Sequence, residues 1–280
     1  MTEEGQGGQR RYAPELALAL RMADSADELT VRRFQALDLV VETKPDLTPV
    51  SDADKATEEL LRTALAESYP RDAIVGEEMG GDSPDQSWAG RRWVLDPIDG
   101  TKNYVRGVPV WATLIALVDG SQAVVGVVSA PALGRRWWAS RGSGAWAGGA
   151  LVGTPRRIGV SAVASLADAS LSYSDVAGWP DGGATFRDLA GRCWRTRAYG
   201  DFWSHLLVAE GAVDVAVEPE LSVWDVAALV PVVQEAGGRI TGRGGGPAIF
   251  GGGAVTTNGR LHGEVLRVLG ATEAGGAAAG

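Results

Sequence analysis

Residues 93–101 read WVLDPIDGT. The apolar start of this stretch predicts a strand that ends in two carboxylates three residues apart, Asp96 and Asp99. Pro97 fixes the backbone between them and Gly100 leaves the following turn free, so both carboxylates can lie near one point. Cations that prefer oxygen ligands need such an arrangement. The alternative, which the stretch alone supports equally, is a turn whose acidic side chains bond only the local backbone.

Three further acidic positions add to this stretch. Glu77 follows a short apolar run, so it also lies at the end of an expected strand, although paired glutamates usually belong to a solvated loop. Asp225 stands three residues after Ser222, and Asp54 stands three residues after Ser51. That spacing is typical of a capping box, in which the acid stabilises a helix N-terminus without any ligand. Each position alone favours a structural role, whereas their combination favours a metal site.

The composition restricts the kinds of metal and partner. The 280 residues include two histidines and one cysteine, Cys193. A zinc site built on several histidine or cysteine ligands is therefore excluded, and a divalent cation would have to bind carboxylates, as Mg²⁺ or Mn²⁺ does. The formal net charge of −9 argues against a nucleic-acid partner. A single cysteine forms no internal disulfide, which fits a reducing compartment.

The sequence shows no export or membrane signal. Residues 1–11 are polar and glycine-rich, and no apolar run approaches the roughly 20 residues of a membrane-spanning helix. We therefore expect a cytoplasmic protein without a membrane partner. Residues 1–11 and the alanine- and glycine-rich residues 271–280 are expected to be flexible tails.

The spacing of apolar residues predicts both helices and strands. Pro231 predicts a kink in the last of the helices, which Gly237 ends, and Asp119-Gly120 predicts a hairpin turn. Antiparallel runs of strands flanked by helices favour a layered α+β sandwich over a doubly wound sheet. The helices are expected at 14–41, 51–68, 186–190, 202–210 and 223–236. The strands are expected at 74–75, 93–95, 112–118, 123–129, 137–138, 145–151, 171–174, 194–198 and 213–217.

The acidic motifs together resemble the inositol monophosphatase-like family of metal-dependent, lithium-sensitive phosphatases. The resemblance spans residues 14–269 and rests on five motifs: PVSDAD at 49–54, GEE at 76–78, DPIDGT at 96–101, GSGA at 142–145 and WDVAA at 224–228. It implies a layered α/β/α/β/α sandwich with mainly antiparallel sheets. We divide that fold into an N-terminal half, 12–155, with most of the metal ligands, and a C-terminal half, 156–270, with Asp225 and a substrate-reading segment.

The resemblance also implies a role for each matching residue. Two or three Mg²⁺ ions, or Mn²⁺ in their place, would activate a water that hydrolyses a small phosphate ester without a covalent intermediate. The implied metal ligands are Glu77, Asp96, Asp99, Asp225 and the carbonyl of Ile98, and Asp225 is also implied to bind the substrate. The resemblance further implies that Asp54 and Thr101 orient the attacking water. It also implies that the amides of Gly100 and Thr101 hold the phosphate. We expect the enzyme to be a homodimer.

The choice of ester depends on a second segment. Residues 197–205 read RAYGDFWSH and lie where this family reads the leaving group. Asp201 and Glu218 would favour a cationic alcohol, Phe202 could cover its ring, and Arg197 could contact the phosphate or hold an acid. Ordinary core packing explains Phe202 and its neighbour Trp203 equally well.

Residues 96–117 and 201–217 resemble the actinobacterial histidinol-phosphate phosphatase branch of the family. This branch implies hydrolysis of histidinol phosphate to histidinol in histidine biosynthesis. Two alternatives are an inositol monophosphatase or broad sugar-phosphate phosphatase, and a phospho-ligand-binding protein without catalysis. The intact acidic set and Thr101 argue against the second of these. A nucleotide 3′-phosphatase is less favoured, because the sequence shows no basic pocket for a second phosphate.

Overall fold

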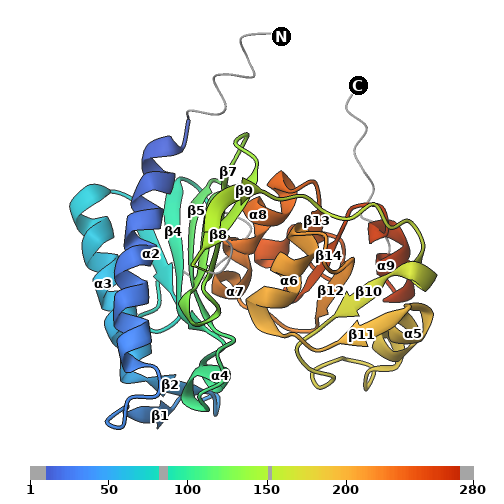
Figure 1. Ribbon diagram of the computed structural model, residues 1–280, viewed down its shortest axis with the longest axis horizontal. Coiled ribbons are helices and arrows are strands. Elements are labelled where there is room, and N and C mark those ends of the chain that lie inside the picture. Colours follow the sequence, from blue (N-terminus) through green and yellow to red (C-terminus); the bar gives the residue numbers. More distant parts are fainter. Residues whose placement is uncertain (1–10, 82–87, 151–152, 272–280) are drawn as a thin grey trace.

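The computed structural model describes residues 11–81, 88–150 and 153–271. Figure 1 shows five layers side by side: helices α2 and α3, a large sheet, helices α6 to α8, a smaller sheet, and helices α5 and α9. This is the layered α+β sandwich that the sequence predicts. None of the helices described is both long and apolar enough to span a bilayer.

The large sheet has seven strands in chain order, and only its first pair is parallel. Alternate residues of its central strands enter two different cores, because helices cover both faces. Trp93 and Ile115 pack toward α2 and α3, whereas Val94 and Leu114 pack toward α7 and α8. The strands are β3 Ala73–Gly76, β4 Arg91–Asp99, β5 Ala112–Asp119, β6 Gln122–Ala130, β7 Arg135–Ser140, β8 Ala145–Gly149 and β9 Gly153–Arg157.

The small sheet has the strand order β11-β10-β12-β14-β13. Strand β10 is parallel to both of its neighbours, and the remaining pairs are antiparallel. The strands are β10 Ser170–Ser172, β11 Arg195–Arg197, β12 Val215–Glu218, β13 Arg239–Thr241 and β14 Ala254–Thr257. A separate hairpin pairs β1 Val41–Thr43 with β2 Pro49–Ser51. Counted by pairs, the sheets are mainly antiparallel, as expected.

The helices of the described chain separate and cover the sheets. Helices α2 and α3 pack on the outer face of the large sheet, and α9 packs on the small one (Figure 1). The α-helices are α2 Ala13–Arg33, α3 Asp52–Ser68, α4 Thr101–Val105, α5 Ala184–Arg192, α6 Asp201–Ala209, α7 Val223–Ala227, α8 Leu229–Glu235 and α9 His262–Val268. The 3₁₀ turns are η1 Pro131–Leu133, η2 Leu166–Asp168 and η3 Ala248–Phe250.

Two helix predictions need correction. The helix expected over 14–41 ends at Arg33, because Phe34 turns to an extended conformation and packs its ring on Tyr104 and Trp111. The helix expected over 223–236 is two helices, α7 and α8, that meet at Ala228. Pro231 explains this break, since a proline has no N–H for the preceding turn and its ring clashes with the carbonyl four residues earlier.

The other predicted elements are found near their expected positions. The strand expected over 145–151 ends at Gly149, and position 151 lies outside the described chain. Most of the two expected tails, residues 1–10 and 272–280, also lies outside it. The division into halves 12–155 and 156–270 stays a prediction.

Candidate active site

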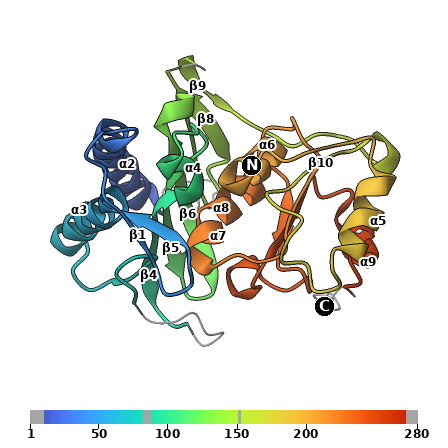
Figure 2. The ribbon, with the colours of Figure 1, turned by 90° about the horizontal axis from the view of Figure 1, so that it is seen from below.

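Three segments of the chain bring four acidic side chains to one place between the two sheets. Asp96 and Asp99 come from the end of β4, Asp225 from the first turn of α7, and Glu77 from the turn after β3. One carboxylate oxygen from each of Asp96, Asp99 and Asp225 lies within 4.8 Å of the others. Figure 2 shows α4 and α7 in the space beside the large sheet, where β4 ends.

A β-bulge in β4 explains why two aspartates three residues apart face the same site. In a regular strand such residues point to opposite faces of the sheet. Here Asp96 pairs with Leu114 but Asp99 pairs with Ala112, so Pro97 and Ile98 together face the single residue Thr113. The extra residue re-aims the following side chain. The Thr113 hydroxyl donates to the carbonyl of residue 97 at 2.8 Å and fixes the bulge.

Gly100 ends the bulge and begins helix α4. Its φ is +84°, in the left-handed region that favours glycine. A Cβ atom at this position would lie 2.9 Å from the Val110 carbonyl and 3.4 Å from the Asp201 carboxylate. The backbone can therefore pass close to both groups only because this residue has no side chain.

The capping interpretation of Asp54 is correct but uses only one of its carboxylate oxygens. Oδ2 accepts the backbone N–H of Ser51 at 2.8 Å and the Ser51 hydroxyl at 2.5 Å. Oδ1 lies 3.1 Å from the hydroxyl of Thr101, which also lies 2.9 Å from the carbonyl of Ile98. The cap thus holds Asp54 rigidly against the end of β4.

Asp225 is arranged in the same way on the opposite side of the site. Its Oδ2 accepts the backbone N–H of Ser222 at 2.7 Å, which completes a second capping box. The same side chain belongs to the acidic cluster with Asp96 and Asp99. The structural and functional interpretations of both capping acids are therefore compatible.

Sequence reasoning missed a positively charged side chain at this site, that of Lys44. The hairpin between β1 and β2 places its Nζ 2.7 Å from Glu77 Oε1 and 2.6 Å from Glu78 Oε1. The segment before β2 carries no motif that marks such a residue, because the contact joins positions 33 residues apart. Lys44 partly balances the charge of Glu77, but within the described chain it forms no ion pair with the aspartates of the cluster.

The charges of the three aspartates in the cluster have few partners among the described residues. Asp96 is 1% exposed, and both of its carboxylate oxygens are buried without a hydrogen-bond partner among the described residues. Burial, followed by the charges of Glu77 and Asp99, raises the pKa of Asp96 well above its usual range. Burial also raises the pKa of Asp99, that of Asp225 to about 6 and that of Glu77 to about 7.

This arrangement fits a hard divalent cation. Buried carboxylates that lack partners are unfavourable in their charged form unless a cation binds them. The available donors are carboxylate oxygens and a backbone carbonyl, which are the ligands that Mg²⁺ and Mn²⁺ prefer. Exposed acidic side chains are hydrated by water, whereas both carboxylate oxygens of Asp96 are buried without a partner among the described residues. This observation distinguishes the cluster from an ordinary acidic surface.

A second acidic pair lies beside the cluster. Asn103 Nδ2 donates to Asp201 Oδ2 at 3.0 Å. The Ser174 hydroxyl accepts the backbone N–H of Asp201 at 2.6 Å and donates to Glu218 Oε1 at 2.6 Å. Burial raises the pKa of Glu218 to about 8. Ser174 therefore links the backbone of Asp201 to Glu218, and Asn103 holds the Asp201 carboxylate; the sequence singled out neither polar residue.

The other two residues expected to bind the substrate are Phe202 and Arg197, and their side chains make other contacts. The Phe202 ring is 1% exposed and packs on Trp137 in the core, while its backbone N–H donates to Asp99 Oδ2 at 2.8 Å. This is the packing role considered for Phe202, and its amide rather than its ring reaches the acidic cluster. Arg197 is exposed on β11, and its Nη1 donates to the carbonyl of Thr196.

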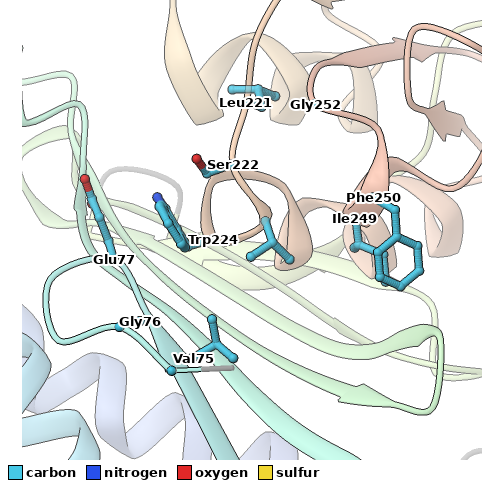
Figure 3. A pocket seen from close by; sticks show the side chains of 12 residues that line it. Val75, Gly76, Glu77, Leu221, Ser222, Trp224, Ile249, Phe250 and Gly252 are labelled. Atoms are coloured by element: carbon cyan, nitrogen blue, oxygen red, sulfur yellow. The ribbon is translucent and has the colours of Figure 1, made fainter. Parts of the chain in front are cut away.

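A cavity of about 390 Å³ borders the acidic cluster at Glu77. Figure 3 shows Glu77 on one wall, with Ser222 and Trp224 from the start of α7 on the opposite side. Phe250 and Ile249 of η3 make an apolar end. The cavity therefore offers both polar and apolar surface beside Glu77, whereas Asp96, Asp99 and Asp225 do not line it.

The comparisons with known proteins agree with this geometry. Residues 12–273 match the model of the inositol monophosphatase family. A histidinol-phosphatase of Streptomyces coelicolor is 56% identical over 92% of this chain and 97% of its own length. A histidinol-phosphatase of Mycobacterium tuberculosis is 58% identical over 92% of this chain and 98% of its own. The structure of an IMPase from Thermotoga maritima superimposes with a TM-score of 0.80 at 30% identity, covering 92% of this chain and 97% of that one.

Proposed function

The chain belongs to the inositol monophosphatase family, and on that premise we propose that its acidic cluster binds Mg²⁺ and hydrolyses histidinol phosphate to histidinol and phosphate. The protein is a phosphoric monoester hydrolase of histidine biosynthesis, as its relatives named histidinol-phosphatase indicate. The observation that carries the proposed site is the convergence of Asp96, Asp99 and Asp225, with both oxygens of the buried Asp96 left without a partner in the described chain.

The residues present suit two or three cations. Asp96, Asp99 and Asp225 would share the first ions, and Glu77 with the carbonyl of Ile98 would complete their coordination; Mn²⁺ has the same ligand preferences. When bound, such ions neutralise the phosphate and favour ionisation of the attacking water. Glu77 also lines the neighbouring cavity that Figure 3 shows.

Asp54 and Thr101 are suited to orient the attacking water. The Thr101 hydroxyl can donate a hydrogen bond to Asp54 Oδ1, 3.1 Å away, which leaves its oxygen free to accept a hydrogen bond from the water. The cap on Asp54 fixes this direction, since its other oxygen is held by Ser51. In the reaction the water oxygen bonds to phosphorus, the ester P–O bond breaks, and a proton moves to the leaving alkoxide.

The phosphate and the leaving group would both lie near Gly100. The absence of a side chain there lets the amides of Gly100 and Thr101 approach an anion at the start of α4. The Asp201 carboxylate approaches the same glycine, 3.4 Å from the point that a Cβ atom would occupy. Asp201 and Glu218 would then bind the positively charged histidinol group as its phosphate is held by the metal site.

The test measures phosphate release from histidinol phosphate by the purified full chain. Activity is expected with Mg²⁺, is expected to vanish after chelation, and is expected to return when Mg²⁺ is restored. Full activity in metal-stripped protein would contradict the proposed metal site. Absence of turnover with Mg²⁺ or Mn²⁺, while Mg²⁺ still binds, would favour the non-catalytic phospho-ligand-binding alternative.

The second candidate is an inositol monophosphatase or broad sugar-phosphate phosphatase. Its support is the similarity to a relative from Aquifex aeolicus named fructose-1,6-bisphosphatase/inositol-1-monophosphatase, which is 33% identical over 72% of this chain. The acids near Gly100 favour histidinol phosphate, because inositol phosphate carries no positive charge on its alcohol. We further propose a homodimer without membrane or nucleic-acid partners, and gel filtration with light scattering tests the dimer.

A further inference from the structure

We infer that Glu58 is a positioning residue for the metal site: it holds the turn that presents Glu77, although it belongs to a different element. The inference rests on the proposed function, because it requires that Glu77 binds a cation. Glu58 lies on α3, one helical turn after Asp54, and its side chain is fully buried. Neither its sequence context nor any motif discussed above assigns it a role.

The carboxylate of Glu58 accepts hydrogen bonds from the turn that follows Glu77. Oε2 accepts the backbone N–H of Glu78 at 2.7 Å, and Oε1 accepts the backbone N–H of Met79 at 3.1 Å. Charge-assisted bonds to backbone amides are stronger than neutral ones. Glu58 therefore fixes the backbone on the C-terminal side of Glu77.

Strand pairing fixes the other side of Glu77. Its backbone N–H donates to the carbonyl of Leu95 in β4 at 3.2 Å, one residue before Asp96. The N–H of Gly76 donates to the carbonyl of Gly80 at 3.0 Å and closes the turn. Glu77 thus stands between an anchor on β4 and an anchor on α3, so the position of its backbone beside the cluster is fixed.

Gly76 gives independent evidence that the turn and Glu58 fit each other. A Cβ atom on Gly76 would lie 2.1 Å from Glu58 Oε1, far closer than any real contact. The φ angle of Gly76 is not in the left-handed region, so backbone conformation alone does not demand a glycine there. The need for glycine comes from the close approach of the Glu58 carboxylate (Figure 3 labels Gly76 and Glu77 on this turn).

Arg62 completes the anchor. Its Nε donates to Glu58 Oε1 at 2.7 Å, and its Nη2 donates to the carbonyl of Gly80. The arginine compensates the buried charge of Glu58 and bonds the end of the same turn. Helix α3 therefore supports the site at two places, through Asp54 on Thr101 and through the Glu58–Arg62 pair on the turn.

The consequence is a weaker metal site when Glu58 changes, even though Glu58 contacts no ligand. In metal sites, residues that orient the ligands typically affect affinity by 10- to 100-fold. Glu58→Gln keeps the volume but loses the charge and replaces one acceptor with an NH₂ group that faces an N–H donor. We expect its Kd for Mg²⁺ to rise roughly 10- to 100-fold, with kcat largely restored at saturating Mg²⁺.

The experiment titrates Mg²⁺ alone into the metal-free full chain by isothermal calorimetry, with thermal melts of the same samples. Glu15→Gln is the matched control, since Glu15 is a buried acid paired with Arg91 at 3.0 Å on helix α2, away from the cluster. Both variants are expected to melt below wild type, but only Glu58→Gln is expected to bind Mg²⁺ more weakly. Equal Kd values in wild type and Glu58→Gln overturn the inference and leave the proposed function intact.

Two further variants keep the test decisive if Glu58→Gln folds poorly. Arg62→Met is expected to raise the Kd for Mg²⁺ severalfold, because the turn loses its outer anchor.

Gly76→Ala is expected to weaken Mg²⁺ binding in the wild type but much less in a Glu58→Ala background, where the clashing oxygen is absent. An equal effect of Gly76→Ala in both backgrounds contradicts the inference. Wild-type protein that binds no Mg²⁺ contradicts the proposed metal site as well.

Discussion

Asp54 and Asp225 show how a single residue serves stability and chemistry together. Each uses one carboxylate oxygen to cap its own helix through a serine three residues earlier. Asp54 directs its other oxygen to Thr101, and Asp225 joins the acidic cluster. The sequence predicted both residues but could not choose between cap and ligand, since the same spacing serves both. It missed Lys44 and Glu58, whose contacts with the Glu77 turn join distant segments.

Asp99→Asn tests the charge of the cluster. The amide oxygen can still accept the N–H of Phe202, so the fold should persist, while the charge that would hold a cation is lost. We expect kcat/KM to fall by about 100-fold or more, which is about 2.7 kcal/mol of transition-state stabilisation. Phosphate release and circular dichroism measure the two properties. A folded variant with near wild-type turnover would show that Asp99 is only a turn residue.

Asp225→Asn separates capping from metal binding. The side-chain oxygen of asparagine can still accept the backbone N–H of Ser222. The variant should therefore melt close to wild type but turn over poorly. Asp225→Ala should lose both functions, and loss of a cap reduces the free energy of unfolding by roughly 0.5–2 kcal/mol. Thermal melts and phosphate release on both variants provide the comparison. Retained turnover in Asp225→Asn, together with a large fall in Tm, would support a purely structural role.

The raised pKa of Glu218 predicts that the stability of the protein depends on pH. Burial raises its pKa to about 8 in the folded protein, above the ordinary value of 4.5. The folded state therefore binds the proton more tightly than the unfolded state, and this contribution to the free energy of unfolding is lost as pH rises from about 4.5 to about 8. Glu218→Gln removes this contribution, so its Tm relative to wild type should increase from pH 5 to pH 8. A difference in Tm that does not change with pH contradicts the assignment.

At the scale of elements, the bulge in β4 and the break between α7 and α8 shape the site. The bulge turns Asp96 and Asp99 to one side, and the break starts α8 anew over the large sheet. The sequence predicted the strand end and the effect of Pro231, since both depend on local residues. It missed β13 and β14, because these short strands lie among glycines and are held by each other and by β12.

The packing of α8 on the large sheet gives a prediction about Gly126 of β6. A Cβ atom there would lie 2.2 Å from the Ala228 carbonyl and 2.7 Å from Pro231 Cγ. Gly126→Ala should therefore reduce the free energy of unfolding by roughly 1–3 kcal/mol, measured by denaturant titration. Gly191 in α5 is the control, because a Cβ meets nothing within 4 Å. Gly191→Ala should instead stabilise by roughly 0.5–1 kcal/mol. A neutral Gly126→Ala would contradict this packing.

For the molecule as a whole, the layered sandwich places two distant segments at one site. Residues 96–101 end a strand of the large sheet, and Asp225 begins a helix after the last residues of β12 in the small sheet. The family motifs predicted this layering and the order of the acids. The Asn103 and Ser174 contacts that place Asp201 beside Glu218 were not predictable, because they depend on how the two sheets meet.

The combined site should prefer one ester over another. Histidinol phosphate presents an ammonium and an imidazole group, both able to carry positive charge near neutral pH, whereas inositol phosphate presents only hydroxyls. Asp201 and Glu218, linked through Ser174, should bind the cation. A charged hydrogen bond of this kind contributes on the order of 1–3 kcal/mol, which corresponds to roughly a factor of five to a hundred in efficiency.

The decisive measurement compares kcat/KM for histidinol phosphate and inositol 1-phosphate at one Mg²⁺ concentration, in wild type and in Glu218→Gln. We predict much higher efficiency on histidinol phosphate in the wild type. Glu218→Gln should narrow the gap, because a bound cation favours the ionised form of Glu218, whereas the variant keeps the volume and cannot ionise. A preserved gap in Glu218→Gln would reject only the role of Glu218. Equal efficiencies on the two esters in wild-type protein would contradict the preference for histidinol phosphate and favour a broad phosphatase.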